Sequence, residues 1–222
     1  MSVSWPEVPD EVAAADLVDA MGRIHRHRCH LLDLVTPTPG RRLFGPCVTI
    51  SYFPTCEAVL DPRRYGFGRL LTEAAGDQPE GKVVVLASNG HTDISLGGGT
   101  KLALAEQMGL GGVLADGRLR DFDELADYSM TVYCRGETTR WGGDVVTPFQ
   151  ANVPVVVGGV GIHPGDFIYA DSSGALTIPA RDIEAVIEGA LAVVVEDAGY
   201  LEALERRADH QGGPVESGHD PR

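Results

Sequence analysis

The central part of the chain reads Gly111-Gly112-Val113-Leu114-Ala115-Asp116-Gly117-Arg118-Leu119-Arg120-Asp121-Phe122-Asp123-Glu124-Leu125. The apolar residues 113–115 predict a buried strand, and the Asp-Gly pair that follows predicts a turn. An adjacent Arg-Asp pair then precedes a helix start. We expect the strand to deliver a cation and a carboxylate to one edge of a sheet, where an anionic substrate and a metal could share them.

The segments around this stretch predict one α/β domain. The apolar run 82–87 is typical of a strand buried on both faces, and the three glycines 97–99 open a helix over residues 101–108. With the strand at 113–115 these elements form a short βαβ unit. Another strand is expected at 47–53, and short strands with Gly and Pro turns are expected over 131–179, most clearly at 153–157 and 167–170.

A helix is expected at each end of this domain. Asp10 is a candidate N-cap for a helix through Val12, Leu17, Val18 and Met21. Apolar residues at helical spacing predict a long C-terminal helix over 181–205. We therefore expect a single domain over 1–207 and a flexible tail over 208–222.

Composition limits the function. The chain has 222 residues, 43% hydrophobic and 23% charged, with a formal net charge of −14. It carries no long apolar span and no signal-peptide pattern, so the cytoplasm is the expected location and a membrane association is not expected. The negative charge argues against nucleic acid but suits a basic protein partner. Any anion site must be locally positive, and Arg120 is the candidate cation.

Cysteines and histidines give little sign of a metal centre. The four cysteines have no CxxC spacing and are expected to be buried free thiols: Cys29, Cys47, Cys56 and Cys134. The basic run 23–30 contains His25, His27 and His30 but lacks the i, i+4 spacing of a helical zinc site. A solvated face is the simpler interpretation of that run.

Three motifs resemble the family of class II 4-hydroxy-4-methyl-2-oxoglutarate aldolases and the related regulator of ribonuclease E activity, RraA. Residues 116–125 are similar to the family pattern DGxxRDxDEL, and residues 45–50 to its GpAvTv strand. Residues 152–171 resemble its NvPV and PGD signature. The resemblance implies a single-domain swivelling β/β/α fold of the RraA-like family with flanking N- and C-terminal helices, assembled as a homotrimer or a dimer of trimers.

The resemblance also implies roles for the Arg-Asp pair. Arg120 would be catalytic and hold the pyruvyl part of the substrate; the alternative is a surface arginine paired with Asp123 or Glu124. Asp121 would be a ligand, direct or through water, of a divalent metal, with Mg²⁺ expected and Mn²⁺ possible. Its alternative is structural, because Asp121 and Glu124 also have the spacing of a helix capping box.

The glycine loop completes the expected substrate site. Gly98, Gly99, Thr100 and Lys101 fit the substrate-binding loop of the family, at the start of a helix whose amides can bind an anion. In the alternative interpretation Gly99 only permits a tight strand-to-helix turn. The aldolases carry an acidic residue after the glycine equivalent to Gly98, and it helps activate the water that removes the substrate hydroxyl proton. Here that position is Gly99.

A substitute base must then come from elsewhere in the chain. His91 is the candidate we assign to catalysis, because it follows the 82–87 strand and should lie at the same sheet edge. Asp93, or Glu196 or Glu202 of a neighbouring subunit, are further candidates. Asp116 is expected to be a turn former, with a supporting role in the site as the alternative.

The resemblance, together with the Arg-Asp pair and the glycine loop, implies a divalent-metal-dependent carbon–carbon lyase. It would act on a small 2-oxo acid through a pyruvate enolate, as an oxaloacetate decarboxylase, a 4-hydroxy-4-methyl-2-oxoglutarate aldolase, or both. The missing acid favours decarboxylation, which needs only the electron sink. The alternatives are a non-catalytic regulator of ribonuclease E like RraA, and a diverged pathway-specific enzyme of the same fold.

Overall fold

A computed structural model describes residues 5–24, 28–56, 58–61 and 63–211. In this part of the chain, eight strands form one mixed sheet in the order β1-β12-β11-β2-β3-β5-β7, with β8 also paired to β2. The neighbouring pairs among β2, β3, β5 and β7 are parallel, and the other pairs in this sheet are antiparallel. The main-sheet strands are β1 (His30–Leu31), β2 (Leu43–Pro54), β3 (Val83–Ala87), β5 (Gly112–Ala115), β7 (Thr131–Cys134), β8 (Val146–Ala151), β11 (Phe167–Asp171) and β12 (Gly174–Ile178).

Strand β2 connects the two halves of the sheet. Its first residues pair with β11, Leu43 with Ala170 and Pro46 with Phe167, while Cys47 onward pairs with β3. The outer end of β2 pairs with β8. Two short pairs complete the strands, one of β9 (Val155–Val157) with β10 (Val160–Ile162), and one of β4 (Ser95–Gly97) with β6 (Arg118–Leu119).

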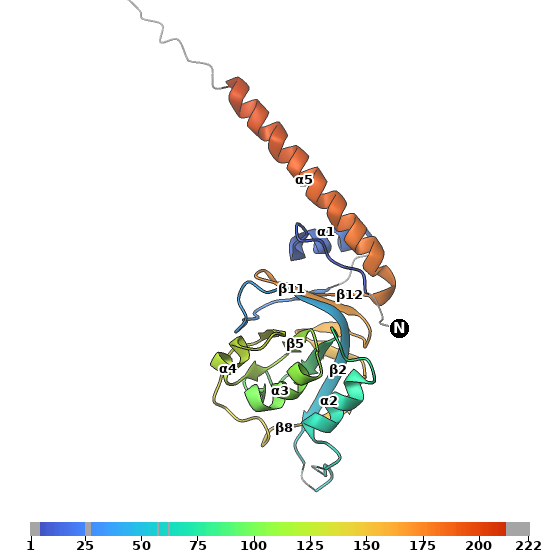
Figure 1. Cartoon of the computed structure of the whole chain (residues 1–222), viewed down its shortest axis with the longest axis vertical. Helices are drawn as coiled ribbons and strands as arrows, with labels where there is room; N and C mark the ends of the chain where they lie inside the picture. Colours follow the sequence, from blue (N-terminus) through green and yellow to red (C-terminus); the bar gives the residue numbers. More distant parts are fainter. Residues whose placement is uncertain (1–4, 25–27, 57, 62, 212–222) are drawn as a thin grey trace, which may run out of the picture.

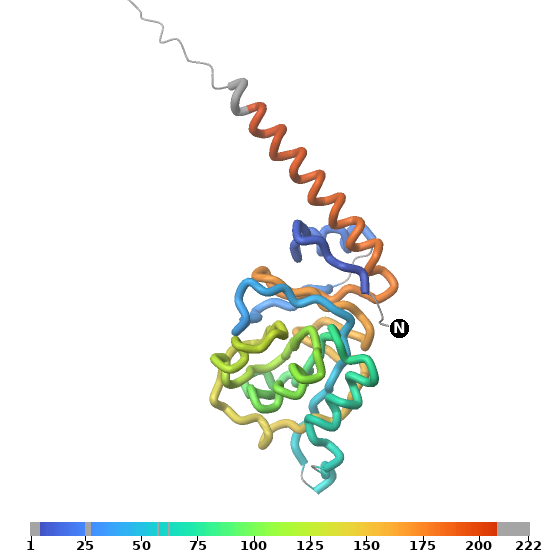
Figure 2. Tube along the Cα trace, in the orientation of Figure 1, coloured from blue at the N-terminus to red at the C-terminus, as the bar shows by residue number. Residues whose placement is uncertain are grey.

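Helices cover the sheet in two groups. Figure 1 shows α1 (Ala14–Ile24) and α5 (Ile183–Gln211) beside β11 and β12, and the other three helices around the parallel strands. These are α2 (Phe67–Ala75), α3 (Gly99–Gln107) and α4 (Phe122–Ala126), and the 3-10 turn η1 (Ala180–Asp182) precedes α5. The tube in Figure 2 shows α1 lying against the first part of α5, whose far end projects from the body. None of the described helices is long and apolar enough to cross a membrane.

Three clusters of buried side chains explain the predicted strands and helices. All five residues of β3 are buried, as expected for a parallel strand covered on both faces. The apolar face of α5 begins with Ile183, Val186, Ile187 and Ala190, which pack with α1 against β11 and β12. The mixed α/β single-domain prediction and both flanking helices are confirmed.

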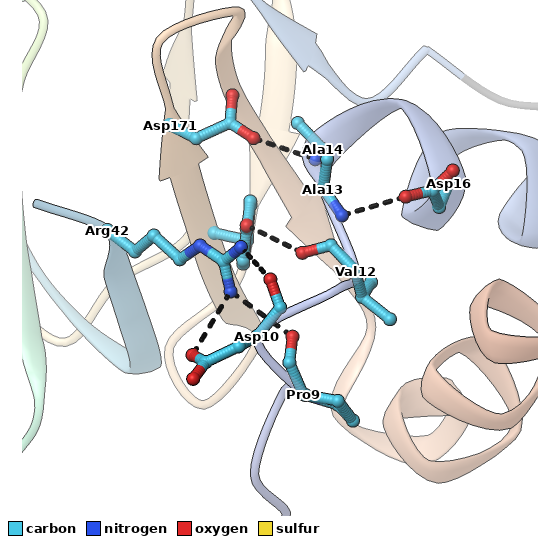
Figure 3. Close-up of polar contacts among 9 residues, drawn as sticks. Pro9, Asp10, Val12, Ala13, Ala14, Asp16, Arg42 and Asp171 are labelled. Atoms are coloured by element: carbon cyan, nitrogen blue, oxygen red, sulfur yellow. Dashed lines mark hydrogen bonds and ion pairs between the residues drawn. The ribbon is translucent and has the colours of Figure 1, made fainter. Parts of the chain in front are cut away.

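The start of α1 differs from the prediction. The helix begins at Ala14, and Asp10 lies in an exposed turn before it. Figure 3 shows the cause: the Ala14 N–H donates to the Asp171 carboxylate at the end of β11 (2.9 Å), and the Ala13 N–H donates to Asp16 (2.8 Å). Arg42 meanwhile binds the backbone carbonyl of Asp10. The first turn is thus capped by a residue distant in sequence.

The other end of the chain also extends beyond the prediction. Helix α5 continues to Gln211, past the expected limit at residue 205 and into the segment expected to be a flexible tail. Residues 212–222 of that tail lie outside the described residues, as do His25 and His27 of the basic run. The prediction of free cysteines is confirmed, but Cys56 is exposed rather than buried because it lies in the loop after β2.

Candidate active site

The glycine loop and the Arg-Asp pair meet where β4 and β6 end. These two strands pair in parallel, so the residues that follow them emerge at the same edge. The Arg120 N–H donates to the Gly97 carbonyl at 3.0 Å, and α3 begins directly after Gly98. The structure therefore brings Gly98 and Gly99 beside Arg120 and Asp121.

Asp121 has an unusual backbone conformation and does not cap its own helix. Its φ of 64° and ψ of 46° lie in the left-handed region, which costs a non-glycine residue energy and is tolerated best by Asn and Asp. The Oδ2 atom accepts the Gly99 N–H at 3.0 Å. The Phe122 N–H of α4 instead donates to Glu137 Oε1 at 3.0 Å. The capping-box alternative is therefore wrong: Glu137 caps α4, and Asp121 lies at the N-terminus of α3.

Arg120 has an exposed side chain. Within the described residues its guanidinium makes no hydrogen bond or ion pair, so the alternative pairing with Asp123 or Glu124 does not form. Lys101 lies close enough that the Arg120 charge, together with the larger effect of burial, lowers the pKa of Lys101. Two cations, Arg120 and Lys101, therefore lie at this edge of an otherwise acidic protein, beside the carboxylates of Asp121 and Glu137.

An open cleft of about 510 Å³ lies in front of this pair. It has room for a small organic acid with its bound water. Its lining is polar and comes from two segments: Arg120, Asp121, Glu137, Thr138 and Thr139. Sequence reasoning missed the last three. The signal available was their position, since this polar run follows directly after the buried strand β7 and Gly136.

The donor set around Asp121 fits a hydrated Mg²⁺ ion better than zinc. No group of three or more His, Cys, Asp or Glu side chains that could hold a metal occurs among the residues that the structure describes. Mg²⁺ commonly keeps several waters and takes only one or two protein carboxylates. The Gly99 N–H donates to Oδ2 of Asp121, whereas Oδ1 of Asp121 has no hydrogen-bond partner in the described part of the chain. That atom could ligate the ion directly or through water.

Other predicted residues lie apart from the cleft. His91 is in the turn after β3, where its N–H donates to the Ser88 carbonyl at 3.4 Å, and it does not line the cleft. Asp93 faces Arg118 at 3.8 Å. Glu196 pairs with Arg23 of α1 at 2.8 Å, on the opposite side of the main sheet from α3 and α4. The catalytic role of His91 stays a prediction.

Glu202 and Asp116 also have partners within the chain. Glu202 faces Arg206 at 3.4 Å on the projecting part of α5. The carboxylate of Asp116 is buried and accepts hydrogen bonds from Arg135 at 3.0 and 3.2 Å. Burial raises the pKa of Asp116, and the charge and hydrogen bonds of Arg135 only partly oppose that effect. These contacts favour the structural interpretation of Asp116.

Comparison with known proteins agrees with this architecture. The family described as Aldolase/RraA matches residues 14–177, which is most of the chain. The chain belongs to the RraA-like family. The match includes the glycine loop, the Arg-Asp pair and the strands that position them.

Relatives within the RraA-like family carry different names. A protein of Halalkalibacterium halodurans named "Putative 4-hydroxy-4-methyl-2-oxoglutarate aldolase" is 32% identical over 136 residues, covering 61% of this chain and 62% of that protein. Protein DlpA of Legionella pneumophila is 28% identical over 166 residues, covering 73% of this chain. The chain spans only 26% of DlpA and somewhat under two thirds of the Halalkalibacterium protein.

Solved structures of the RraA-like family share the fold. An uncharacterized protein of Pseudomonas syringae superposes with a TM-score of 0.71 at 25% identity, covering 94% of both chains. RraAS2 of Streptomyces coelicolor, described as an unusual member of the RNase ES inhibitor RraA family, superposes with a TM-score of 0.73 at 24% identity. That likeness covers 89% of this chain and 93% of RraAS2, and it concerns the fold alone.

Proposed function

We propose that the protein is a divalent-metal-dependent carbon–carbon lyase acting on a small 2-oxo acid. The observation that carries the proposal is the exposed Arg120, which has no side-chain partner among the residues that the structure describes. It lies beside Asp121 in its left-handed conformation, in a polar cleft at the start of α3. Strain of this kind persists where the surrounding structure enforces it, and it concentrates at binding and catalytic sites. Names of relatives as 4-hydroxy-4-methyl-2-oxoglutarate aldolases point to the same chemistry.

Arg120 would bind the substrate carboxylate. A guanidinium matches a carboxylate with two parallel hydrogen bonds, and no described side chain competes for it. Lys101 adds charge that attracts a dianion into the cleft. We therefore assign binding of the 2-oxo acid carboxylate to Arg120.

The start of α3 would stabilise the enolate formed when the carbon–carbon bond breaks. Gly99 donates its N–H to Asp121, and the Lys101 and Leu102 N–H groups are directed to the Gly98 carbonyl. Thr100 therefore offers the first-turn amide that is open to a substrate oxygen in the described structure, at the positive end of the helix dipole. Of the backbone amides in the predicted substrate-binding loop, we therefore assign enolate binding to that of Thr100.

Asp121 would hold the metal, which we expect to be Mg²⁺ or Mn²⁺. When bound, the ion would act as a Lewis acid that polarises the 2-oxo group. Asp121 itself keeps a fixed orientation, because its left-handed backbone and its bond to Gly99 both restrict the side chain. As in the resemblance described above, we expect the active assembly to be a homotrimer or a dimer of trimers.

A second candidate is a non-catalytic regulator that binds a basic protein. The net charge of −14 favours it, because complementary charge steers association. The fold shared with RraAS2 is compatible with it. This function would need neither the free guanidinium of Arg120 nor the strained Asp121, so we place it second.

The test is pyruvate release from oxaloacetate and from 4-hydroxy-4-methyl-2-oxoglutarate, with Mg²⁺, with Mn²⁺ and with chelator. Arg120→Ala should lower kcat/KM by on the order of 100-fold or more, since a charged, bidentate contact is lost. Arg69→Ala is the matched control, because Arg69 is exposed on α2 and does not line the cleft. Absence of metal-dependent release from both substrates would overturn the proposal and leave the regulator or a diverged enzyme of the same fold.

A further inference from the structure

A carboxylate from α4 fills the space above the first residue of α3. A Cβ atom added to Gly99 would overlap the carboxylate of Glu124. Gly99 is not among the glycines with positive φ, so its backbone does not require glycine. The missing side chain at position 99 instead makes room for the Glu124 carboxylate at the edge of the candidate site.

A neutral hydroxyl group holds this carboxylate in place. The Tyr128 hydroxyl lies 2.9 Å from Glu124 Oε1 and 3.0 Å from the Gly99 carbonyl oxygen. Burial has the largest effect in raising the pKa of Tyr128, and the hydrogen bond to Glu124 raises it further. The hydroxyl therefore remains a neutral donor. No ion pair to Glu124 forms within the described residues. Glu124 is therefore oriented without being neutralised by a cation.

Glu124 is close to the groups that would bind the substrate. Asp121 lies just before α4 and Glu124 lies within it, and the carboxylates of both are directed to Gly99 at the start of α3. Asp121 contacts the Gly99 N–H, whereas Glu124 covers the Cα side of the same residue. Arg120 lies next to Gly98, where an added Cβ would come within 3.2 Å of the Arg120 Cβ. An exposed carboxylate with no cation partner in the described part of the chain thus adjoins the edge where Arg120 lies.

We propose that Glu124 is the proton acceptor for retro-aldol cleavage of a 4-hydroxy-2-oxo acid at this site. The inference rests on the proposed lyase function. The C4 hydroxyl proton passes to the Glu124 carboxylate, directly or through one water, and the C4–O bond becomes a carbonyl. The C3–C4 bond breaks and its electron pair forms the enolate of pyruvate. The enolate carbon then takes a proton back from the Glu124 carboxylic acid, which regenerates the carboxylate.

Decarboxylation supplies the internal comparison. Oxaloacetate loses CO₂ without giving up a hydroxyl proton, and the resulting enolate takes its proton from water, so this reaction needs Arg120 and the metal but not the acceptor. Glu124→Gln keeps the size of the side chain and its contact with Tyr128. A positioned base contributes typically about 10²- to 10⁴-fold. We expect Glu124→Gln to lower kcat for aldol cleavage at least about 100-fold, and to leave oxaloacetate decarboxylation and oxalate binding close to wild type.

Moving the carboxylate tests its position rather than its charge. In Gly99→Asp/Glu124→Ala, the new aspartate occupies the space that Glu124 vacates, and an acidic residue suits the first turn of a helix. We expect this double variant to recover at least about 10-fold of the cleavage rate that Glu124→Ala loses, well within the range of base catalysis. Asp123→Asn is the matched control, since it removes a neighbouring exposed charge on α4.

The outcomes separate this inference from the proposed function. Aldol cleavage by wild type that survives in Glu124→Gln overturns the inference, as does an equal loss of both reactions, which would indicate a structural role. Wild type that decarboxylates but never cleaves the aldol overturns the inference and leaves the lyase function standing. Wild type with neither activity overturns both. Selective loss in Glu124→Gln supports the inference even if the double variant does not fold.

Discussion

Replacing Gly98 by alanine tests whether the close approach of the glycine loop to Asp121 builds the site. An added Cβ would overlap Asp121 Oδ2 and would lie 3.2 Å from the Arg120 Cβ and 3.3 Å from the Asp121 Cγ. The left-handed turn fixes the backbone of Asp121. The overlap must therefore be relieved by its side chain, and the Asp121 carboxylate must move away from residue 98. The backbone at Gly98 itself is extended, with φ of −166°, and accepts alanine without strain.

The expected magnitude follows from this displacement. A shift of ~1 Å at a catalytic group costs on the order of 100-fold, so Gly98→Ala should lower metal-dependent pyruvate release by about 10- to 100-fold. Folding should change little, since reduced chain entropy in the unfolded state contributes about 0.4–1 kcal/mol in the favourable direction and offsets part of the contact strain.

The assay pairs pyruvate release with thermal unfolding, and Gly161→Ala is the control. An added Cβ at Gly161 in β10 meets no atom within 4 Å. Activity of Gly98→Ala equal to that of Gly161→Ala would refute the reasoning, because the overlap with Asp121 would then have no consequence. Loss of activity with a collapsed melting temperature would also refute it, because the effect would be on folding.

Three further predictions concern stability. Asp116→Ala should lower the free energy of unfolding by about 3 kcal/mol in urea, because it leaves the mostly buried guanidinium of Arg135 unpaired; an effect no larger than that of removing an exposed ion pair elsewhere would contradict this. Hydrogen bonds from Ser129 and Met130 outweigh the opposing effect of burial and lower the pKa of Glu106. Glu106→Gln should therefore have a lower free energy of unfolding than wild type at pH 7, since the ionised Glu106 stabilises the fold above its unfolded pKa. The difference between the two proteins should disappear as the pH falls through the lowered pKa. A difference that does not change with pH would contradict this explanation. Gly22→Ala should raise the free energy of unfolding by about 0.5–1 kcal/mol, because α1 gains helix propensity and an added Cβ meets nothing within 4 Å; a destabilised variant would be the contrary result.

Local sequence patterns predict those helices and strands whose burial depends on their own side chains. The apolar run at 82–87 becomes the buried strand β3, and the glycines before α3 start that helix as expected. Helical spacing likewise predicts the buried face of α5. These predictions succeed because the buried face of a strand or helix sets the spacing of apolar residues along its own sequence.

Features that depend on distant residues are not predicted. Helix α1 begins later than predicted, because the Ala14 N–H in its first turn donates to the carboxylate of Asp171 on β11. The Asp121–Glu124 pattern resembles a capping box, but Glu137 from the segment after β7 caps α4 instead. The candidate bases predicted from the sequence are His91, Asp93, and Glu196 or Glu202 of a neighbouring subunit. The fold instead brings the carboxylate of Glu124 on α4 against Gly99.

The most direct test of the account is metal binding at Asp121, measured by titrating Mn²⁺ into the protein and following the paramagnetic resonance of free Mn²⁺. Asp121→Asn removes the charge, and asparagine also tolerates the left-handed backbone, so the fold should be preserved. The account predicts that wild type and the control Asp123→Asn bind one Mn²⁺ per chain, and that binding by Asp121→Asn weakens at least about 10-fold, as expected for loss of a metal-ligating group. Equal Mn²⁺ affinity in wild type and Asp121→Asn, or no binding by wild type, would contradict the claim that this pair of residues forms a metal-dependent lyase site.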